Sequence, residues 1–126
     1  MKMLLLATTG GAIGAGARHL VNLGVGRMLG TNFPWATLTV NVVGSFLMGV
    51  LIEALILRYS SSVEMRTFLG TGILGGFTTF SAFSLDIALL LGRKEHGLAM
   101  LYIAASVGVS LAMLYAGMAA TRAALS

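Results

Sequence analysis

The sequence contains little charge and no cysteine. Of its 126 residues 10% are charged, one is proline, two are histidine and none is cysteine. Disulfides and thiolate metal sites are thereby excluded, and two isolated histidines are too few for a transition-metal site within one chain. No nucleophile, base and orienting group lie at a recognisable spacing. We therefore expect the protein not to be an enzyme.

Apolar residues are abundant instead. They make up 57% of the chain, and the mean hydropathy of +0.94 lies outside the range of ordinary soluble domains. A helix needs about 20 mostly apolar residues to cross a bilayer. Four stretches joined by short connectors satisfy this requirement: 3–28, 35–57, 68–91 and 98–120. The chain is predicted to be an all-α integral membrane protein in which residues 1–126 form one transmembrane domain.

The net charge of +4 is spread along the chain. No arginine-rich tract or aromatic platform accompanies the basic residues, so we expect membrane lipid and no nucleic acid as a partner. One side of the membrane would hold Lys2, Arg58, Arg66 and Arg122, and the other Arg27, Arg93 and Lys94. This balance leaves two interpretations open: a further cue fixes the orientation, or the chain inserts both ways. In the second case a homodimer of oppositely oriented copies would supply the second wall of a polar pathway.

Polar residues inside the predicted spans fall into rows spaced four residues apart. The rows are Thr37, Asn41 and Ser45 in the second span, and Tyr102, Ser106 and Ser110 in the fourth. Residues at this spacing share a helix face, so each of these helices carries a stripe of hydrogen-bond donors. A single serine or threonine is more simply explained by bonding within or between helices. Asn41 fits that explanation less well, because its NH₂ group can be offered to an anion.

Three charged residues and several glycine pairs also lie within the spans. Arg18 is far inside the first span, where a charge either is functional or bonds backbone carbonyls and extends to the interface. Glu53 and Asp86 do not form a paired acid–base site, and water-filled vestibules would accommodate them. Small residues four apart predict close helix packing at Gly10 and Gly14, Gly26 and Gly30, and Gly72 and Gly76.

The string GGFTTFSAFS, residues 75–84, predicts a break in the third span. Its glycines and threonines weaken helix propensity at the centre of the span. Unwound backbone at membrane depth must be buried or line a cavity, and its carbonyls can hold a cation such as Na⁺. The carbonyls of Gly75 and Thr78, which flank the expected break, are the natural ligands.

Phe80 and Phe83 follow the expected break and share one helix face. The edge of an aromatic ring is electropositive, so two such rings beside a hydroxyl can present weak positive potential to a partly dehydrated anion. Ordinary helix packing is the alternative, and the spacing alone favours it.

Taken together, these motifs resemble the Fluc or CrcB fluoride channels of bacteria over the whole chain. The resemblance rests on GGAIGAGARH (10–19), PWATLTVNVVGSF (34–46) and GTGILGGFTTFSAFSLD (70–86), together with the row in the fourth span. It implies an antiparallel, dual-topology homodimer in the bacterial inner membrane, with two fluoride pores and a central structural Na⁺. It further implies passive, selective fluoride export that protects the cell from fluoride.

The resemblance also assigns roles to individual residues. Gly75 and Thr78 match the carbonyl ligands of Na⁺. Arg18 is a candidate for a vestibule or structural position because of its place inside the first span, and not through the resemblance. The matches to the fluoride pathway are Asn41, Phe80, Phe83, Ser81, Ser110, Tyr102 and Thr37. Leu114 stands where we expect a hydroxyl one turn beyond Ser110.

Two other functions remain open on the sequence. A proton-coupled small multidrug exporter also has four spans, but it needs a membrane-embedded carboxylate, ordinarily on the first span, which here contains Arg18 and no acid. A non-conducting membrane scaffold would use the polar rows only to join helices. It predicts no ion flux and no effect of changing Phe80 or Asn41 on transport.

Overall fold

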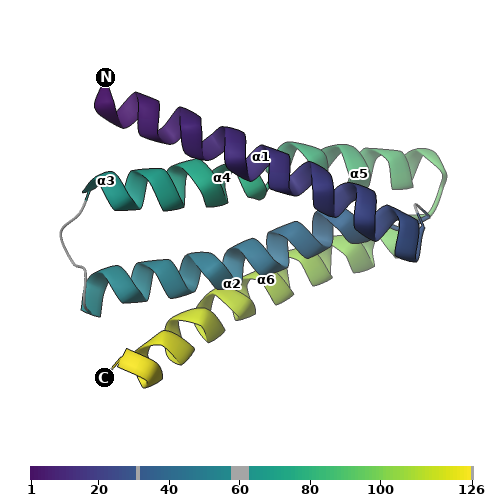
Figure 1. Cartoon of the computed structure of the whole chain (residues 1–126). Coiled ribbons are helices and arrows are strands. Elements are labelled where there is room, and N and C mark those ends of the chain that lie inside the picture. The colour runs from purple at the N-terminus through teal and green to yellow at the C-terminus, as the bar shows by residue number, and fades with distance from the viewer. Residues whose placement is uncertain (31, 58–62, 126) are drawn as a thin grey trace.

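The computed structural model describes residues 1–30, 32–57 and 63–125, and all regular structure in these ranges is helical. The elements are α1 (Lys2–Leu29), α2 (Trp35–Leu57), α3 (Val63–Met65), the π-helix η1 (Arg66–Leu74), α4 (Gly75–Phe77), α5 (Phe80–Gly92) and α6 (His96–Leu125). Because α3, η1 and α4 follow one another without a gap, they form a single rod that α5 continues after a break (Figure 1). The predicted all-α architecture of four long helices with an interrupted third is therefore present.

Three of the four rods are long and apolar enough to cross a membrane. They are Trp35–Leu57, Val63–Gly92 and His96–Leu125. The first rod is α1, whose glycines, Arg18 and His19 keep its hydropathy low. The helix predicted over 3–28 is thus present, whereas its passage through the membrane stays a prediction.

Glycine allows α1 to pack directly on the backbone of the third rod. A Cβ atom on Gly14 would overlap the carbonyl oxygen of Ile73, and one on Gly76 would lie 2.6 Å from the carbonyl oxygen of Gly11. This confirms the close packing predicted for the pairs at 10 and 14 and at 72 and 76. Within one chain the prediction was wrong for Gly26 and Gly30, since a Cβ there would meet no atom of the other described residues within 4 Å; Gly30 instead ends α1 with a φ of 79°.

The most extensive packing between helices joins α2 and α6. A Cβ atom on Gly49 would overlap the carbonyl oxygen of Leu114, and one on Gly117 would overlap that of Phe46. Both helices start from the same end of the molecule and run in the same direction, and both chain termini lie at the opposite end, on opposite sides of it (Figure 1). This parallel seam holds the polar rows of the second and fourth spans next to each other.

Candidate functional site

The third rod is interrupted at Thr78 and Thr79, which adopt extended backbone conformations. The Thr79 N–H donates to Asn41 Oδ1 at 2.9 Å, and Asn41 Nδ2 donates to the Thr79 carbonyl at 3.1 Å. In a continuous helix the Thr79 N–H would instead donate to the Gly75 carbonyl. Asn41 therefore replaces a helical hydrogen bond, and it leaves the Gly75 carbonyl without that donor.

Side chains of the two threonines end one helix and start the next. Thr78 donates through both its N–H and its Oγ1 to the Leu74 carbonyl, each at 3.0 Å. The Thr79 Oγ1 accepts from the Ala82 N–H at 3.2 Å, which makes Thr79 the N-cap of α5. The break is thus built by specific hydrogen bonds on both sides.

A groove of about 420 Å³ opens beside the break. Its lining comes from α2, the break, α5 and α6, and comprises Asn41, Gly44, Ser45, Met48, Thr78, Thr79, Phe80, Phe83, Ser106, Val107, Ser110 and Leu114. The fold thereby brings together four of the residues predicted for the fluoride pathway. These are Asn41, Phe80, Phe83 and Ser110.

Some hydrogen-bond donors in the groove are already bonded within the protein, and others are not. Within the described ranges, the buried hydroxyls of Ser106 and Ser110 have no hydrogen-bond partner. Asn41 bonds Thr79, yet a carboxamide nitrogen carries two hydrogens, so one remains. A buried donor without a partner is costly, and an ion in the groove would relieve that cost.

The two phenylalanines of the groove have different surroundings. Phe83 is 7% exposed and packs against Tyr102 with ring centroids 5.1 Å apart, whereas Phe80 is 77% exposed. The centroids of Phe80 and Phe83 are 5.6 Å apart and their planes are inclined by 50°. Phe83 is therefore fixed by the core, while Phe80 presents its ring at the surface of the single chain.

A second cavity of about 510 Å³ lies near the start of α2. Its polar lining residues include Asn22, Thr37, Asp86 and Arg93. Tyr102 is fully buried, and its hydroxyl donates to Asp86 Oδ2 at 2.9 Å. Since Tyr102 contacts both Asp86 of this cavity and Phe83 of the groove, it lies between the two spaces.

Comparison with known proteins identifies the family. Residues 5–118 match the family described as CrcB-like protein, Camphor Resistance (CrcB). The chain belongs to this family. The chain is 55% identical over 118 residues to the fluoride-specific ion channel FluC of Chelativorans sp. (strain BNC1), with 94% of each chain covered. It is 52% identical over 126 residues to the FluC of Rhodospirillum centenum, with 100% of both covered, and 54% identical over 122 residues to that of Agrobacterium fabrum, with 97% and 98% covered.

The remaining predicted residues of this CrcB-like chain lie outside the groove. Thr37 lines the second cavity, and Ser81 is exposed, with its Oγ 3.3 Å from Thr79 Oγ1. Arg18 is half-buried on α1 and lines neither space. The structure thus brings Asn41, Phe80, Phe83 and Ser110 to one groove, while the fluoride pathway itself stays a prediction.

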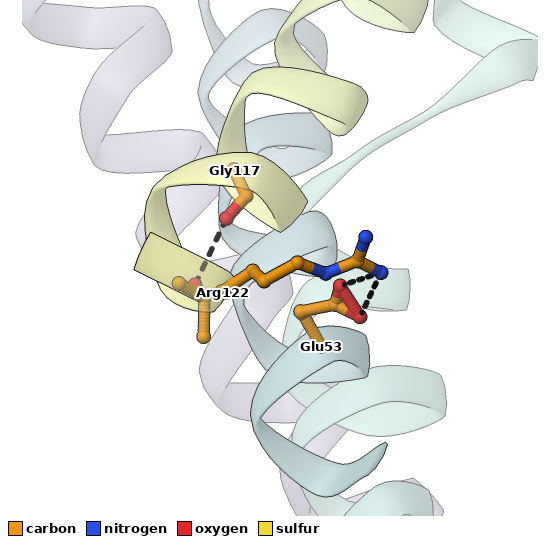
Figure 2. Close-up of polar contacts among 4 residues, drawn as sticks. Glu53, Gly117 and Arg122 are labelled. Carbon is orange, nitrogen blue, oxygen red and sulfur yellow. Dashed lines mark hydrogen bonds and ion pairs between the residues drawn. The ribbon is translucent and has the colours of Figure 1, made fainter. Parts of the chain in front are cut away.

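Two features of the CrcB-like chain were not found from the sequence. One is the pairing of Asn41 with the Thr79 backbone, for which side-chain patterns give no signal. The other concerns Glu53, for which a water-filled vestibule was suggested; that suggestion was wrong. Glu53 is 1% exposed and forms an ion pair with Arg122, with Oε2 2.9 Å from Nη2 (Figure 2).

Proposed function

We propose that this CrcB-like protein is a passive, highly selective fluoride channel of the bacterial inner membrane. It lets cytoplasmic fluoride leave the cell down its electrochemical gradient and so confers fluoride resistance. It is not an enzyme. The observation that carries the proposal is the groove, where the hydroxyls of Ser106 and Ser110, which have no hydrogen-bond partner in the described part of the chain, lie beside two phenylalanine rings. The full-length similarity to fluoride-specific channels supports it.

Selectivity follows from the cost of dehydrating fluoride. A small anion loses tens of kcal/mol of hydration free energy on entering an apolar site, on the order given by Born reasoning. The Asn41 amide and the hydroxyls of Ser106 and Ser110 replace part of this hydration, and the ring edges of Phe80 and Phe83 add weak positive potential. A larger anion is held less well by the same narrow set of donors.

Passive flow follows from the chemistry of the lining. No acidic residue is among the described residues that line the groove, so fluoride passes without a coupled proton carrier. Serine hydroxyls can rotate, which allows each to follow the ion as it moves. Donors one helical turn apart, about 6 Å along α6, let the ion pass from one to the next.

A structural Na⁺ fits the backbone at the break. The last carbonyls of a helix have no partner within it and form the negative end of the helix dipole. Here the Thr79 amide is turned to Asn41, which leaves the Gly75 carbonyl available, and Thr78 is extended. The carbonyls of Gly75 and Thr78 would hold the ion, and its positive charge would fix the break and favour an anion nearby.

An antiparallel dual-topology homodimer with two pores completes the proposal. In the single chain, Phe80 of the groove is 77% exposed, and a second copy would cover it. The balance of basic residues between the two ends, four against three, is consistent with insertion in both orientations. The carbonyls at the breaks of both copies would then share the Na⁺.

The multidrug exporter is less well supported. That mechanism needs a carboxylate that can exchange a proton with substrate in the transport chamber. The buried carboxylate of the second span, Glu53, is instead held by Arg122 at 2.9 Å and does not line the groove.

Efflux from liposomes tests the proposed function. Purified protein is reconstituted into vesicles loaded with fluoride or with chloride, and release of each ion is followed with an ion-selective electrode. We expect rapid fluoride release, little chloride release and no dependence of the fluoride rate on a proton gradient. Well-folded protein that releases no fluoride, or that moves a cationic drug against protons, would contradict the proposal.

A further inference from the structure

An ion pair between a buried carboxylate and a largely exposed arginine joins the far ends of α2 and α6. Glu53 is 1% exposed, and both of its carboxylate oxygens accept from Arg122 Nη2, at 2.9 and 3.3 Å. Figure 2 shows the arginine reaching from α6 across to α2. A buried carboxylate that loses its partner is strongly destabilising. The end of α6 therefore has to dock where Arg122 reaches Glu53.

The residue numbers of the pair define an alignment of the two parallel helices. The offset between the partners is 122 − 53 = 69 positions. The same offset places Asn41 level with position 110 and Thr37 level with position 106. Both of these positions on α6 are serines, and both line the groove with Asn41. The ion pair and the assembled groove thus share one alignment.

The polar rows cannot select this alignment by themselves. Both rows repeat every four residues, so sliding α6 by one turn, about 6 Å, again sets polar residues opposite polar residues. The close contacts at Gly49 and Gly117 also favour the observed alignment, because a slide of one turn would bring Met113 or Thr121 of α6 to the position that Gly117 now occupies. A charge pair occurs only once along the seam. Fixing the register of packed helices is the best-attested role of buried polar and ionic groups.

We propose that the Glu53–Arg122 ion pair fixes the axial register of α6 on α2 and so positions the groove donors. Neither residue touches the groove, which makes both positioning residues. The functional consequence rests on the proposed function: in the wrong register, the hydroxyls of Ser106 and Ser110 no longer stand opposite Asn41, and fluoride loses its continuous set of donors.

The register is measured directly with two spin labels. The chain has no cysteine, so Val43→Cys on α2 and Ala120→Cys on α6 provide the only labelling sites, and both positions are exposed. Labelled protein is diluted with unlabelled protein so that only distances within one chain are recorded. The distance is compared in the parent, in Glu53→Gln and in Arg122→Gln. The second variant changes a side chain that is 67% exposed, so it removes the charge without opening a cavity in the core.

We expect loss of either charge to add or shift a distance, with a one-turn slip moving the labels by about 6 Å along the seam. Fluoride efflux should fall about tenfold or more, because misplaced donors raise the barrier to conduction and even a small rise in the barrier gives a tenfold slower rate. Exchanging the charges, with Glu53→Lys and Arg122→Glu together, should restore the distance and bring efflux back to within about threefold. The control is Glu64→Gln, which removes the exposed ion pair with Lys2 and should change neither readout.

An unchanged distance in both single variants would overturn the proposal, whatever happens to efflux. A shifted distance with normal efflux would also overturn it, because the register would then not position the donors. If the parent protein releases no fluoride, the proposed function fails, and the distance comparison still decides whether the pair fixes the register.

Discussion

In the groove, the important property of each donor is whether the fold already uses it. Asn41 has two tasks, because its carboxamide both closes the break on Thr79 and leaves one N–H toward the groove. Ser106 and Ser110 would serve conduction alone, since their buried hydroxyls have no hydrogen-bond partner among the described residues. Changes at Asn41 should therefore disturb structure and conduction together, and changes at the serines conduction alone.

Asn41→Asp should lower the rate of fluoride efflux by about 10- to 100-fold, because an unmatched buried polar group costs about 1–3 kcal/mol. A carboxylate cannot donate to the Thr79 carbonyl, and its charge repels the anion. Efflux from liposomes measures the effect. Thr39→Val on the same helix is the control, since the side-chain hydrogen bond of Thr39 among the described residues stays within α2, to the Trp35 carbonyl at 2.7 Å. Equal rates for Asn41→Asp and the parent would contradict the assigned role.

Sequence patterns identify residues more readily than their partners. Asn41 stands out because a carboxamide in an apolar span needs explanation, but its partner is a backbone 38 positions away that no side-chain pattern reveals. Glu53 was noticed for the same reason. Its neutralising partner Arg122, 69 positions away, was counted only as a loop charge. Pairings of this kind depend on how the helices pack.

At the scale of the elements, glycine decides how the helices meet. Gly14 of α1 lies directly on the backbone at Ile73, and this contact orients the rod that carries the break. The sequence predicted such faces from small residues four apart, and it placed the interruption within the correct ten-residue string. It did not separate the buried glycines from those at 26 and 30, because spacing carries no information about which face has a neighbour.

Gly14→Ala should lower the free energy of unfolding by about 1–3 kcal/mol, the usual cost of forcing a methyl group into a packed contact. The added Cβ would overlap the Ile73 carbonyl oxygen. Thermal unfolding in detergent, followed by tryptophan fluorescence, measures the change. Gly16→Ala serves as the control on the same helix, because a Cβ there meets no atom of the other described residues within 4 Å. Alanine favours a helix more than glycine does, so Gly16→Ala should leave the stability unchanged or raise it. Equal changes in stability for both substitutions would contradict a packing contact at Gly14.

At the scale of the whole molecule, the proposed channel consists of two chains and a Na⁺ ion. A single chain leaves the ring of Phe80 largely exposed and leaves the Gly75 carbonyl without its helical donor. Two oppositely oriented copies would cover the Phe80 ring and share a cation at the Gly75 carbonyls. Ion binding and dimer stability should therefore depend on each other.

Replacing Na⁺ by N-methylglucamine should lower the melting temperature of the reconstituted or detergent-solubilised protein. A ligand present at 100 times its dissociation constant stabilises the folded state by about 2.7 kcal/mol. The melting temperature should rise with the logarithm of Na⁺ concentration and less with the larger K⁺. A melting temperature that does not change with Na⁺ would contradict a structural cation at the break.

Fluoride efflux from liposomes that contain a Ser106→Ala, Ser110→Ala double variant shows whether the groove hydroxyls carry the ion. Ser84→Ala, at an exposed position on α5, is the matched control. We expect the double variant to fold normally and to release fluoride at least about tenfold more slowly, while the control matches the parent. A folded double variant with unchanged fluoride release would show that the ion does not pass along these hydroxyls.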